Sequence, residues 1–460
     1  MSKTLSKTIE SLNPATEETI AVYELADEGE IDRVLGRAER AFGAWRRVHL
    51  PERQKRMRAL AAVLREKKSE LAAVITSEMG KPIVESEAEI EKCAWNCDWY
   101  SENAADLLAN RPAPSAASDS YIQFLPLGTV LAIMPWNFPF WQVYRFAAPA
   151  LMAGNTAVLK HASNVSGCSL SIAETFRDAG FPEGVFQSIL VPGSAVSRLI
   201  QDNRIAAVTL TGSEGAGSQV GAEAGRVIKK TVLELGGSDP FIVLADADLE
   251  TTVKTAVKAR FQNTGQSCIA AKRFIVVESV FAEFSRRFAE MVERLRIGPP
   301  TDRVTQIGPL ARNDLREGIE KQVEASVGQG AEVLVGGHRI AGKGFFYAPT
   351  VLTDVVPSMT AGCEEVFGPV AALMKVRDEE EAIRVANDSP FGLGSSLWTT
   401  DLEKARRLAR QIEAGQVFVN GMVASDPRLP FGGVKKSGYG RELSDFGIRE
   451  FVNIQTVWIK

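Results

Sequence analysis

The pattern of apolar and polar positions divides the chain into a helical N-terminal part and a long region of mixed structure. Between residues 31 and 108, apolar residues recur at intervals of three and four among charged ones, which is the spacing of amphipathic helices. From Thr129 onward, short apolar runs alternate with helical segments. This alternation predicts parallel sheets with helices on both faces.

The predicted elements fall into two series, with a domain boundary near Gly236 and Gly237. In the first series we expect strands at residues 129–134, 156–159, 206–210, 231–235 and 241–244, and helices at 165–179 and 217–224. In the second we expect strands at 274–277, 332–335 and 417–420, and helices at 280–295, 379–386 and 402–412. Residues 451–460 alternate like a strand with one buried face. Because an unpaired terminal strand promotes aggregation, we expect it to pair with another subunit.

Composition narrows the functional class. The chain of 460 residues is too long for one ordinary core, and its 45% hydrophobic and 24% charged content is typical of globular proteins. A net charge of −4 with both signs mixed predicts no nucleic-acid partner. The weakly polar stretch 125–159 contains four prolines, so we expect no membrane span. Five scattered cysteines, and no apolar leader in residues 1–7, favour the cytoplasm.

The strongest candidate for chemistry is the thiol of Cys268. It ends a small polar loop, residues 261–268, shortly before the apolar run 274–277. A thiol that only filled a core would sit among Leu, Val and Phe, whereas this loop can bend closely around a small substrate. We therefore interpret Cys268 as a nucleophile. A Cys–His hydrolase is not supported, because no triad-like context surrounds the three histidines, His49, His161 and His338.

Two polar residues at predicted strand ends are candidate partners of this thiol. Asn137 lies between two prolines in residues 135–139, where a rigid amide could donate to an oxyanion; the alternative is a turn Asn that caps its own backbone. Glu234 has apolar neighbours, which makes it a candidate general base with a raised pKa; the alternative is an exposed strand-end carboxylate.

Two further patterns are a Gly-rich turn, whose role stays open, and a pair of cysteines, for which packing is favoured. The Gly-rich turn at residues 211–217 could bind a phosphate at a helix N-terminus, but its spacing differs from G-x-G-x-x-G, and a plain tight turn explains it equally well. Cys93 and Cys97 lie four apart on a predicted helix without a suitable third ligand, so we expect buried packing and no metal.

Together these motifs resemble the aldehyde dehydrogenases. Six segments follow the family's order along nearly the whole chain, namely residues 135–139, 211–217, 233–237, 263–268, 364–370 and 430–438. The resemblance implies an α/β fold of two Rossmann-like domains with parallel or mixed sheets and a small β oligomerisation arm. It assigns residues 1–110 and 127–236 to the dinucleotide-binding domain, 237–430 to the catalytic domain, and 111–126 and 443–460 to the arm of a homodimer or homotetramer.

The resemblance also implies roles. Cys268 would attack the aldehyde, Asn137 would hold the oxyanion, and Glu234 would activate the water that hydrolyses the thioester. Contacts to the nicotinamide cofactor would come from nine residues, namely Trp136, Lys160, Ser163, Gly212, Ser213, Gly217, Leu235, Glu365 and Phe367. Ser163 stands where NAD-restricted relatives carry Glu, so NADP should be admitted beside NAD, with a slight preference for NADP.

Three residues bear on the substrate. Arg145 stands where succinate-semialdehyde dehydrogenases carry a carboxylate-binding Arg, and Ser425 lies near the loop that supplies a hydroxyl; the alternative for Arg145 is an inter-domain ion pair. Gln262 is Arg in some relatives and brings no charge here. We expect oxidation of succinate semialdehyde to succinate. The alternatives are another semialdehyde or a range of aliphatic aldehydes, a CoA-acylating enzyme, which Glu234 disfavours, and a nicotinamide-binding protein without turnover.

Overall fold

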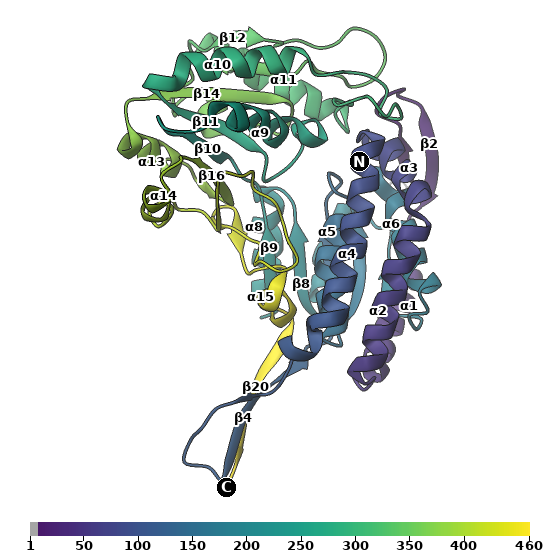
Figure 1. The fold of residues 1–460 in the computed structure, drawn as a ribbon. Coiled ribbons are helices and arrows are strands. Elements are labelled where there is room, and N and C mark those ends of the chain that lie inside the picture. The colour runs from purple at the N-terminus through teal and green to yellow at the C-terminus, as the bar shows by residue number, and fades with distance from the viewer. Residues whose placement is uncertain (1–7) are drawn as a thin grey trace.

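The computed structural model describes residues 8–460, so the expectation about residues 1–7 lies outside the described part of the chain. Figure 1 shows two α/β lobes, each built on its own sheet, and a thin arm of β-strands that projects away from them and carries the C-terminus. The α/β class and the mixed parallel sheets expected from the sequence are confirmed.

The N-terminal part is helical, as expected, but it is preceded by a hairpin that the sequence did not predict. The hairpin joins β1 (Thr8–Leu12) to β2 (Thr19–Glu24), and its side chains are mostly exposed, so no apolar alternation announces it. Four helices follow, α1 (Glu28–Trp45), α2 (Leu50–Glu66), α3 (Lys68–Met79) and α4 (Ile83–Leu107). The side chain of Asp27 caps α1 by accepting from the amide of Glu30.

The first lobe contains a six-stranded sheet in the order β19-β9-β8-β5-β6-β7. Its strands are β5 (Thr129–Met134), β6 (Thr156–His161), β7 (Phe186–Ser188), β8 (Ile205–Thr211), β9 (Lys230–Glu234) and β19 (Gly438–Tyr439). All are parallel except β19, which pairs antiparallel with β9. The chain runs outward from β5 in both directions, so the carboxyl ends of β5 and β8 form a switch point, where open α/β sheets bind ligands.

The second lobe contains a seven-stranded sheet in the order β12-β13-β14-β11-β10-β16-β17. Its strands are β10 (Asp239–Val243), β11 (Ala271–Val277), β12 (Glu332–Val335), β13 (Thr350–Thr353), β14 (Val370–Val376), β16 (Gly394–Trp398) and β17 (Gln416–Val419). Only the edge strand β12 is antiparallel to its neighbour. A small separate pair joins β15 (Phe391–Gly392) to β18 (Val434–Lys435). Of the strands in the seven-stranded sheet, β13, β14 and β16 were not expected from the sequence.

Helices cover both sheets. Those of the first lobe are α5 (Trp141–Met152), α6 (Ser166–Asp178), α7 (Val196–Gln201), α8 (Glu214–Arg226) and the C-terminal α15 (Ser444–Arg449). Those of the second are α9 (Leu249–Phe261), α10 (Glu278–Glu293), α11 (Asn313–Gly328), α12 (Thr360–Cys363), α13 (Glu379–Asn387) and α14 (Leu402–Ala409). The sequence analysis did not predict α5, α7, α9, α11, α12 or α15. It also extended α14 three residues too far, because the apolar spacing continues to Ile412 in a turn beyond the helix end.

The two cysteines on α4 pack in the hydrophobic core of the first lobe. Cys93 and Cys97 are fully buried in the largest apolar cluster, so the packing interpretation is confirmed. All five cysteines are free thiols. Among residues 8–460, no group of three or more potential ligands is arranged to hold a metal ion.

The arm is a three-stranded sheet in which β20 (Val452–Ile459) pairs antiparallel with β4 (Asp119–Pro126), and β4 with β3 (Arg111–Pro112). The expectation of one buried face on the last strand is wrong within this chain, because only Val452 is buried and the arm stands clear of both lobes (Figure 1). Ile454 is 61% exposed and Trp458 53%. No helix in the described chain is both long and apolar enough to cross a membrane.

Candidate active site

Cys268 lies between α9 and β11, at the end of a loop whose backbone is strained. Asn263 and Thr264 both have positive φ, 56° and 55°, a conformation that is unfavourable for residues other than glycine. Gly265 follows with φ 73°, and a Cβ there would approach the carbonyl oxygen of Gly368 to 2.3 Å. Three successive left-handed residues therefore need a surrounding structure that holds them, as is common at active sites.

Asn137 supplies part of that support from the other lobe. Its side-chain amide donates to the carbonyl of Gln266 at 3.0 Å, and its own carbonyl accepts from the side chain of Asn263 at 2.8 Å. The Gln142 amide donates to Asn137 Oδ1 at 3.1 Å, which fixes the amide's orientation. Asn137 is thus buried and rigid beside the nucleophile loop, with one amide hydrogen committed to Gln266 and the second available to another acceptor.

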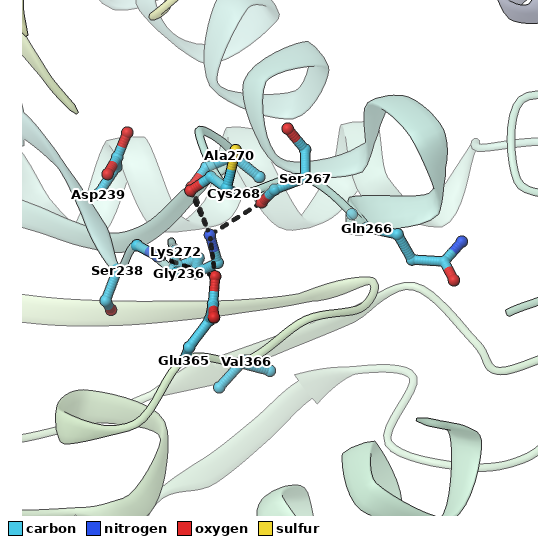
Figure 2. Close-up of polar contacts among 12 residues, drawn as sticks. Gly236, Ser238, Asp239, Gln266, Ser267, Cys268, Ala270, Lys272, Glu365 and Val366 are labelled. Carbon is cyan, nitrogen blue, oxygen red and sulfur yellow. Dashed lines mark hydrogen bonds and ion pairs between the residues drawn. The ribbon is translucent and has the colours of Figure 1, made fainter. Parts of the chain in front are cut away.

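Lys272 supports the nucleophile loop through hydrogen bonds to its backbone. The sequence analysis did not identify this residue. The side chain is almost fully buried, and Nζ donates to the carbonyls of Ser267 and Cys268, both at 2.9 Å (Figure 2). Nζ also lies 3.6 Å from a carboxylate oxygen of Glu365. The available signal was a pair of cations, Lys272 and Arg273, at the start of an apolar strand, because a buried cation needs partners.

The electrostatic surroundings keep the Cys268 thiol protonated in the cofactor-free protein. Burial raises the pKa of the thiol to about 12. The positive charges of Arg145 and Lys272 oppose this shift, whereas the carboxylates of Glu365 and Asp239 reinforce it. Any event that neutralises Glu365 or brings further positive charge to the loop would therefore favour the nucleophilic thiolate.

Glu234 ends β9 and is buried, which excludes the exposed strand-end alternative. Neither of its carboxylate oxygens has a hydrogen-bond partner in the described chain. Burial and then repulsion from Glu442 raise the pKa of Glu234 well above its ordinary value, while Arg145 and Arg441 oppose the rise. The direction expected from the sequence, a raised pKa, agrees with this, and the burial favours the protonated form of the group.

The thiol opens into a cavity of about 410 Å³. Its wall includes all three predicted substrate residues, Arg145, Gln262 and Ser425. Glu234 is not among the described residues that line this cavity. The cavity is lined by four parts of the chain that are distant in sequence, within residues 85–92, 138–145, 258–270 and 422–431, and it brings their polar groups close to the nucleophile. A larger cavity of about 910 Å³ lies over α1 and β7 and touches none of the predicted site residues.

Arg145 contacts Glu442, Thr211 and Phe431 and also borders the cavity of Cys268. It forms an ion pair with Glu442 and donates to the Thr211 hydroxyl at 3.3 Å, and its guanidinium lies 4.4 Å from the ring centroid of Phe431. Glu442 lies between β19 and α15 of the first lobe, so this ion pair is not the inter-domain pair considered from the sequence. Because Arg145 also borders the cavity of Cys268, the pair fixes a positive charge at the cavity wall rather than removing it.

Lys92 is a second cation in this wall that the sequence interpretation missed. It projects from α4, donates to the hydroxyl of Ser425 at 2.7 Å, and lies 4.4 Å from the ring centroid of Trp141. Burial, with a contribution from Arg145, lowers the pKa of Lys92 to about 8. Lys92 lies seven residues after Glu85 and three after Glu89, so the three charged side chains share one face of α4, which was the signal in the sequence.

The predicted cofactor residues gather at the switch point of the first sheet. Ser213 caps α8 by accepting from the amide of Ala216 at 3.3 Å, so the N-terminus of the helix faces the carboxyl ends of β5 and β8. Gly217 lies under Leu235, where a Cβ would meet the leucine at 2.5 Å. Gly212 donates to the carbonyl of Glu234 at 3.0 Å, which ties the turn to β9.

The remaining predicted cofactor residues border the same region. The rings of Trp136 and Phe367 meet edge to face at 5.8 Å between centroids. Glu365 accepts from the Gly237 amide at 2.9 Å, and burial raises its pKa. Lys160 ends β6 with a pKa lowered by burial, and Ser163 is exposed at the start of the next turn. An open helix N-terminus, a basic strand end and a hydroxyl suit a dinucleotide with a phosphorylated ribose.

Comparison with known proteins agrees with this geometry. The aldehyde dehydrogenase family model matches residues 1–457. The chain is 51% identical to the succinate semialdehyde dehydrogenase [NAD(P)+] Sad of Escherichia coli, covering 97% of each chain. It is 52% identical to a probable succinate-semialdehyde dehydrogenase [NADP(+)] of Synechocystis, over 98% of this chain and 99% of the other. A succinic semialdehyde dehydrogenase from Streptococcus pyogenes, solved with NADP+, superposes with a TM-score of 0.96 at 36% identity over 98% and 99% of the two chains. The chain belongs to the aldehyde dehydrogenase family.

Proposed function

We propose that this protein oxidises succinate semialdehyde to succinate with NADP+ or NAD+ as the hydride acceptor. The observation that carries the proposal is the cavity in which Cys268 meets Arg145, Gln262 and Ser425. A fixed guanidinium and a hydroxyl in the wall that also holds the nucleophile suit a short aldehyde with a distal carboxylate. The names of the bacterial relatives agree with this substrate and with both cofactors.

In the proposed reaction the Cys268 thiolate adds to the aldehyde carbon and forms a thiohemiacetal. The free amide hydrogen of Asn137 and the backbone amide of Cys268 stabilise the oxyanion. The bound nicotinamide supplies a hydride acceptor, so loss of hydride from the thiohemiacetal leaves a thioester on Cys268. Glu234, once deprotonated, takes a proton from water, which attacks the thioester and releases the acid and the thiol. The sum is aldehyde, water and NAD(P)+ giving carboxylate, NAD(P)H and two protons.

The cofactor residues are proposed as follows. Ser213 and the α8 N-terminus bind the pyrophosphate, with Gly212, Gly217 and Leu235 shaping the turn that approaches it. Lys160 and Ser163 face the adenosine ribose, where a neutral hydroxyl admits a 2′-phosphate and gives the slight preference for NADP+. Glu365 binds the nicotinamide ribose, and Trp136 with Phe367 flanks the ring.

The larger parts of the chain have corresponding proposed roles. Residues 1–110 with 127–236 bind the dinucleotide, 237–430 carry the nucleophile, and 111–126 with 443–460 form the arm of a homodimer or homotetramer. Support for the arm comes from its exposed apolar side chains. The free thiols support a cytoplasmic location.

The test is a panel of kcat/KM values for succinate semialdehyde, glutarate semialdehyde and butanal with each cofactor. We expect the highest value with succinate semialdehyde, and none with any substrate for Cys268→Ala. An equal or higher value with butanal would reject the substrate assignment. Turnover that required added coenzyme A would reject hydrolysis as the second half of the reaction.

A further inference from the structure

The cavity of Cys268 needs a second positive charge if it is to select a carboxylate strongly. Gln262 is neutral, and Arg145 already faces the carboxylate of Glu442. One guanidinium that shares its charge with a buried carboxylate offers a ligand less than a free cation does. The residue that could supply the missing charge must therefore line the cavity without a carboxylate partner of its own.

Lys92 meets both conditions. Lys258 also does so, but its side chain is exposed, and solvent screens its charge. Lys92 lines the cavity, and it forms no ion pair with any carboxylate in residues 8–460. Its recorded partners are the Ser425 hydroxyl at 2.7 Å and the ring of Trp141. A half-buried ammonium without a counter-ion is unfavourable, and the depressed pKa of Lys92, about 8, reflects this. An anionic ligand would remove the cost.

The hydrogen bond to Ser425 also orients the hydroxyl. Because Lys92 Nζ can only donate, Ser425 Oγ accepts in this pair and keeps its own hydrogen for another acceptor. Lys92 has two further donors. The two side chains therefore present converging donors to the cavity, the arrangement that binds a carboxylate by charge-assisted hydrogen bonds.

We propose that Lys92, together with Ser425, binds the distal carboxylate of the semialdehyde and determines the selectivity of the enzyme for it. This inference rests on the proposed function, and it assigns to a lysine on α4 the charge that Gln262 lacks. Arg145 then contributes a fixed background charge, held by Glu442, rather than the main ligand contact.

The test compares Lys92→Met with the wild type on succinate semialdehyde and on butanal, its analogue without the carboxylate. We expect kcat/KM for succinate semialdehyde to fall on the order of 10- to 100-fold, mainly through KM, because a charge-assisted bond is lost. The value for butanal should stay within about threefold. Succinate, as a competitive inhibitor against butanal, should bind more weakly by a similar factor.

Two further variants keep the test decisive. Lys92→Gln retains a donor for Ser425 without the charge, so it covers the case in which Lys92→Met fails to fold, and it should show the same loss of selectivity. Lys258→Met is the matched control, because Lys258 is an exposed cation that also borders the cavity. It should change both substrates less than about threefold.

The outcomes separate the two proposals. If the wild type does not prefer succinate semialdehyde over butanal, the proposed function fails. If the wild type has the preference and both Lys92 variants retain it, the inference about Lys92 is overturned while the function stands. An equal loss on both substrates together with a lower Tm would assign Lys92 a structural role and would also overturn the inference.

Discussion

The side-chain amide of Asn137 donates a 3.0 Å hydrogen bond to the backbone carbonyl of Gln266, two residues before Cys268. Asn137 follows β5 in the first sheet, and Gln266 precedes β11 in the second. Together with the 2.8 Å bond from the Asn263 side chain to the Asn137 carbonyl, this bond links the ligand-binding edge of one lobe to the nucleophile loop of the other. The orientation of the proposed oxyanion donor and the position of the thiol are therefore set together.

The first prediction concerns this amide. Asn137→Ala should lower kcat by about 10²- to 10³-fold, because it removes an oxyanion donor and a support of the loop. Gln142→Ala, which removes the bond that orients Asn137 but leaves the Asn137 amide in place, is the matched comparison and should cost about tenfold or less. Steady-state kinetics and Tm of both variants check this. Equal losses would mean that Asn137 acts only through packing.

The second prediction concerns Lys272. Lys272→Met should lower kcat/KM by about 10²-fold and the free energy of unfolding by about 2 kcal/mol, since two carbonyls and Glu365 lose a buried partner. Alkylation of Cys268 by iodoacetamide, followed by mass spectrometry, should also slow, because a charge that favours the thiolate is gone. Lys375→Met, at an exposed lysine of β14, is the control. Lower stability with unchanged alkylation would show that Lys272 is only structural.

The third prediction uses the buried carboxylic acid of Glu234. Glu234→Gln should leave the first-turnover burst of NAD(P)H but slow steady-state turnover by at least about 10²-fold, because thioester hydrolysis loses its base. It should also raise Tm more at pH 8 than at pH 5. The folded-state pKa lies above the unfolded value, so the wild type loses stability as pH rises above the unfolded pKa. A Tm difference independent of pH would contradict the buried-acid assignment.

The fourth prediction is a divergence of pH profiles. The pKa of Lys92 is lowered to about 8, so the free enzyme loses this cation as pH rises through that value. The charged or titratable groups that act on it are Arg145, Cys93, Glu89 and Asp426. Above pH 8, kcat/KM for succinate semialdehyde should fall relative to that for butanal, by about tenfold per pH unit at most. The ratio should not change with pH in Lys92→Gln, and a constant ratio in the wild type would contradict the assignment.

The fifth prediction tests the arm. Trp458→Asp should reduce the molar mass in solution to a smaller multiple of 49.9 kDa, because it places a charge on an exposed apolar strand proposed to be an interface. Light scattering after gel filtration measures this. Leu402→Asp is the control, since Leu402 is equally exposed but lies on α14, away from the arm. A wild type that is already monomeric would exclude the oligomerisation role.

Much of the fold followed from local pattern. β5 and β12 have the bounds that their apolar runs predicted, and most of the other predicted strands agree within three residues at each end. The hairpin β1–β2 and the helix α11 were missed. The hairpin is largely exposed, and α11 buries only three residues, so neither has a clear apolar periodicity. The end of α14 was misplaced because the apolar spacing continues past the helix.

The sequence by itself determined the linear motifs, and with them the candidates Cys268, Asn137 and Glu234; the burial of Glu234 and the rigidity of Asn137 came from the tertiary structure. Such motifs are local, because a strand end, a proline or a glycine constrains only its neighbours. The tertiary structure decided which side chains meet across the chain. Lys92 contacts Ser425 over 333 positions, and Arg145 pairs with Glu442. No periodicity encodes such pairs, since they arise only when two sheets and α4 close around one cavity.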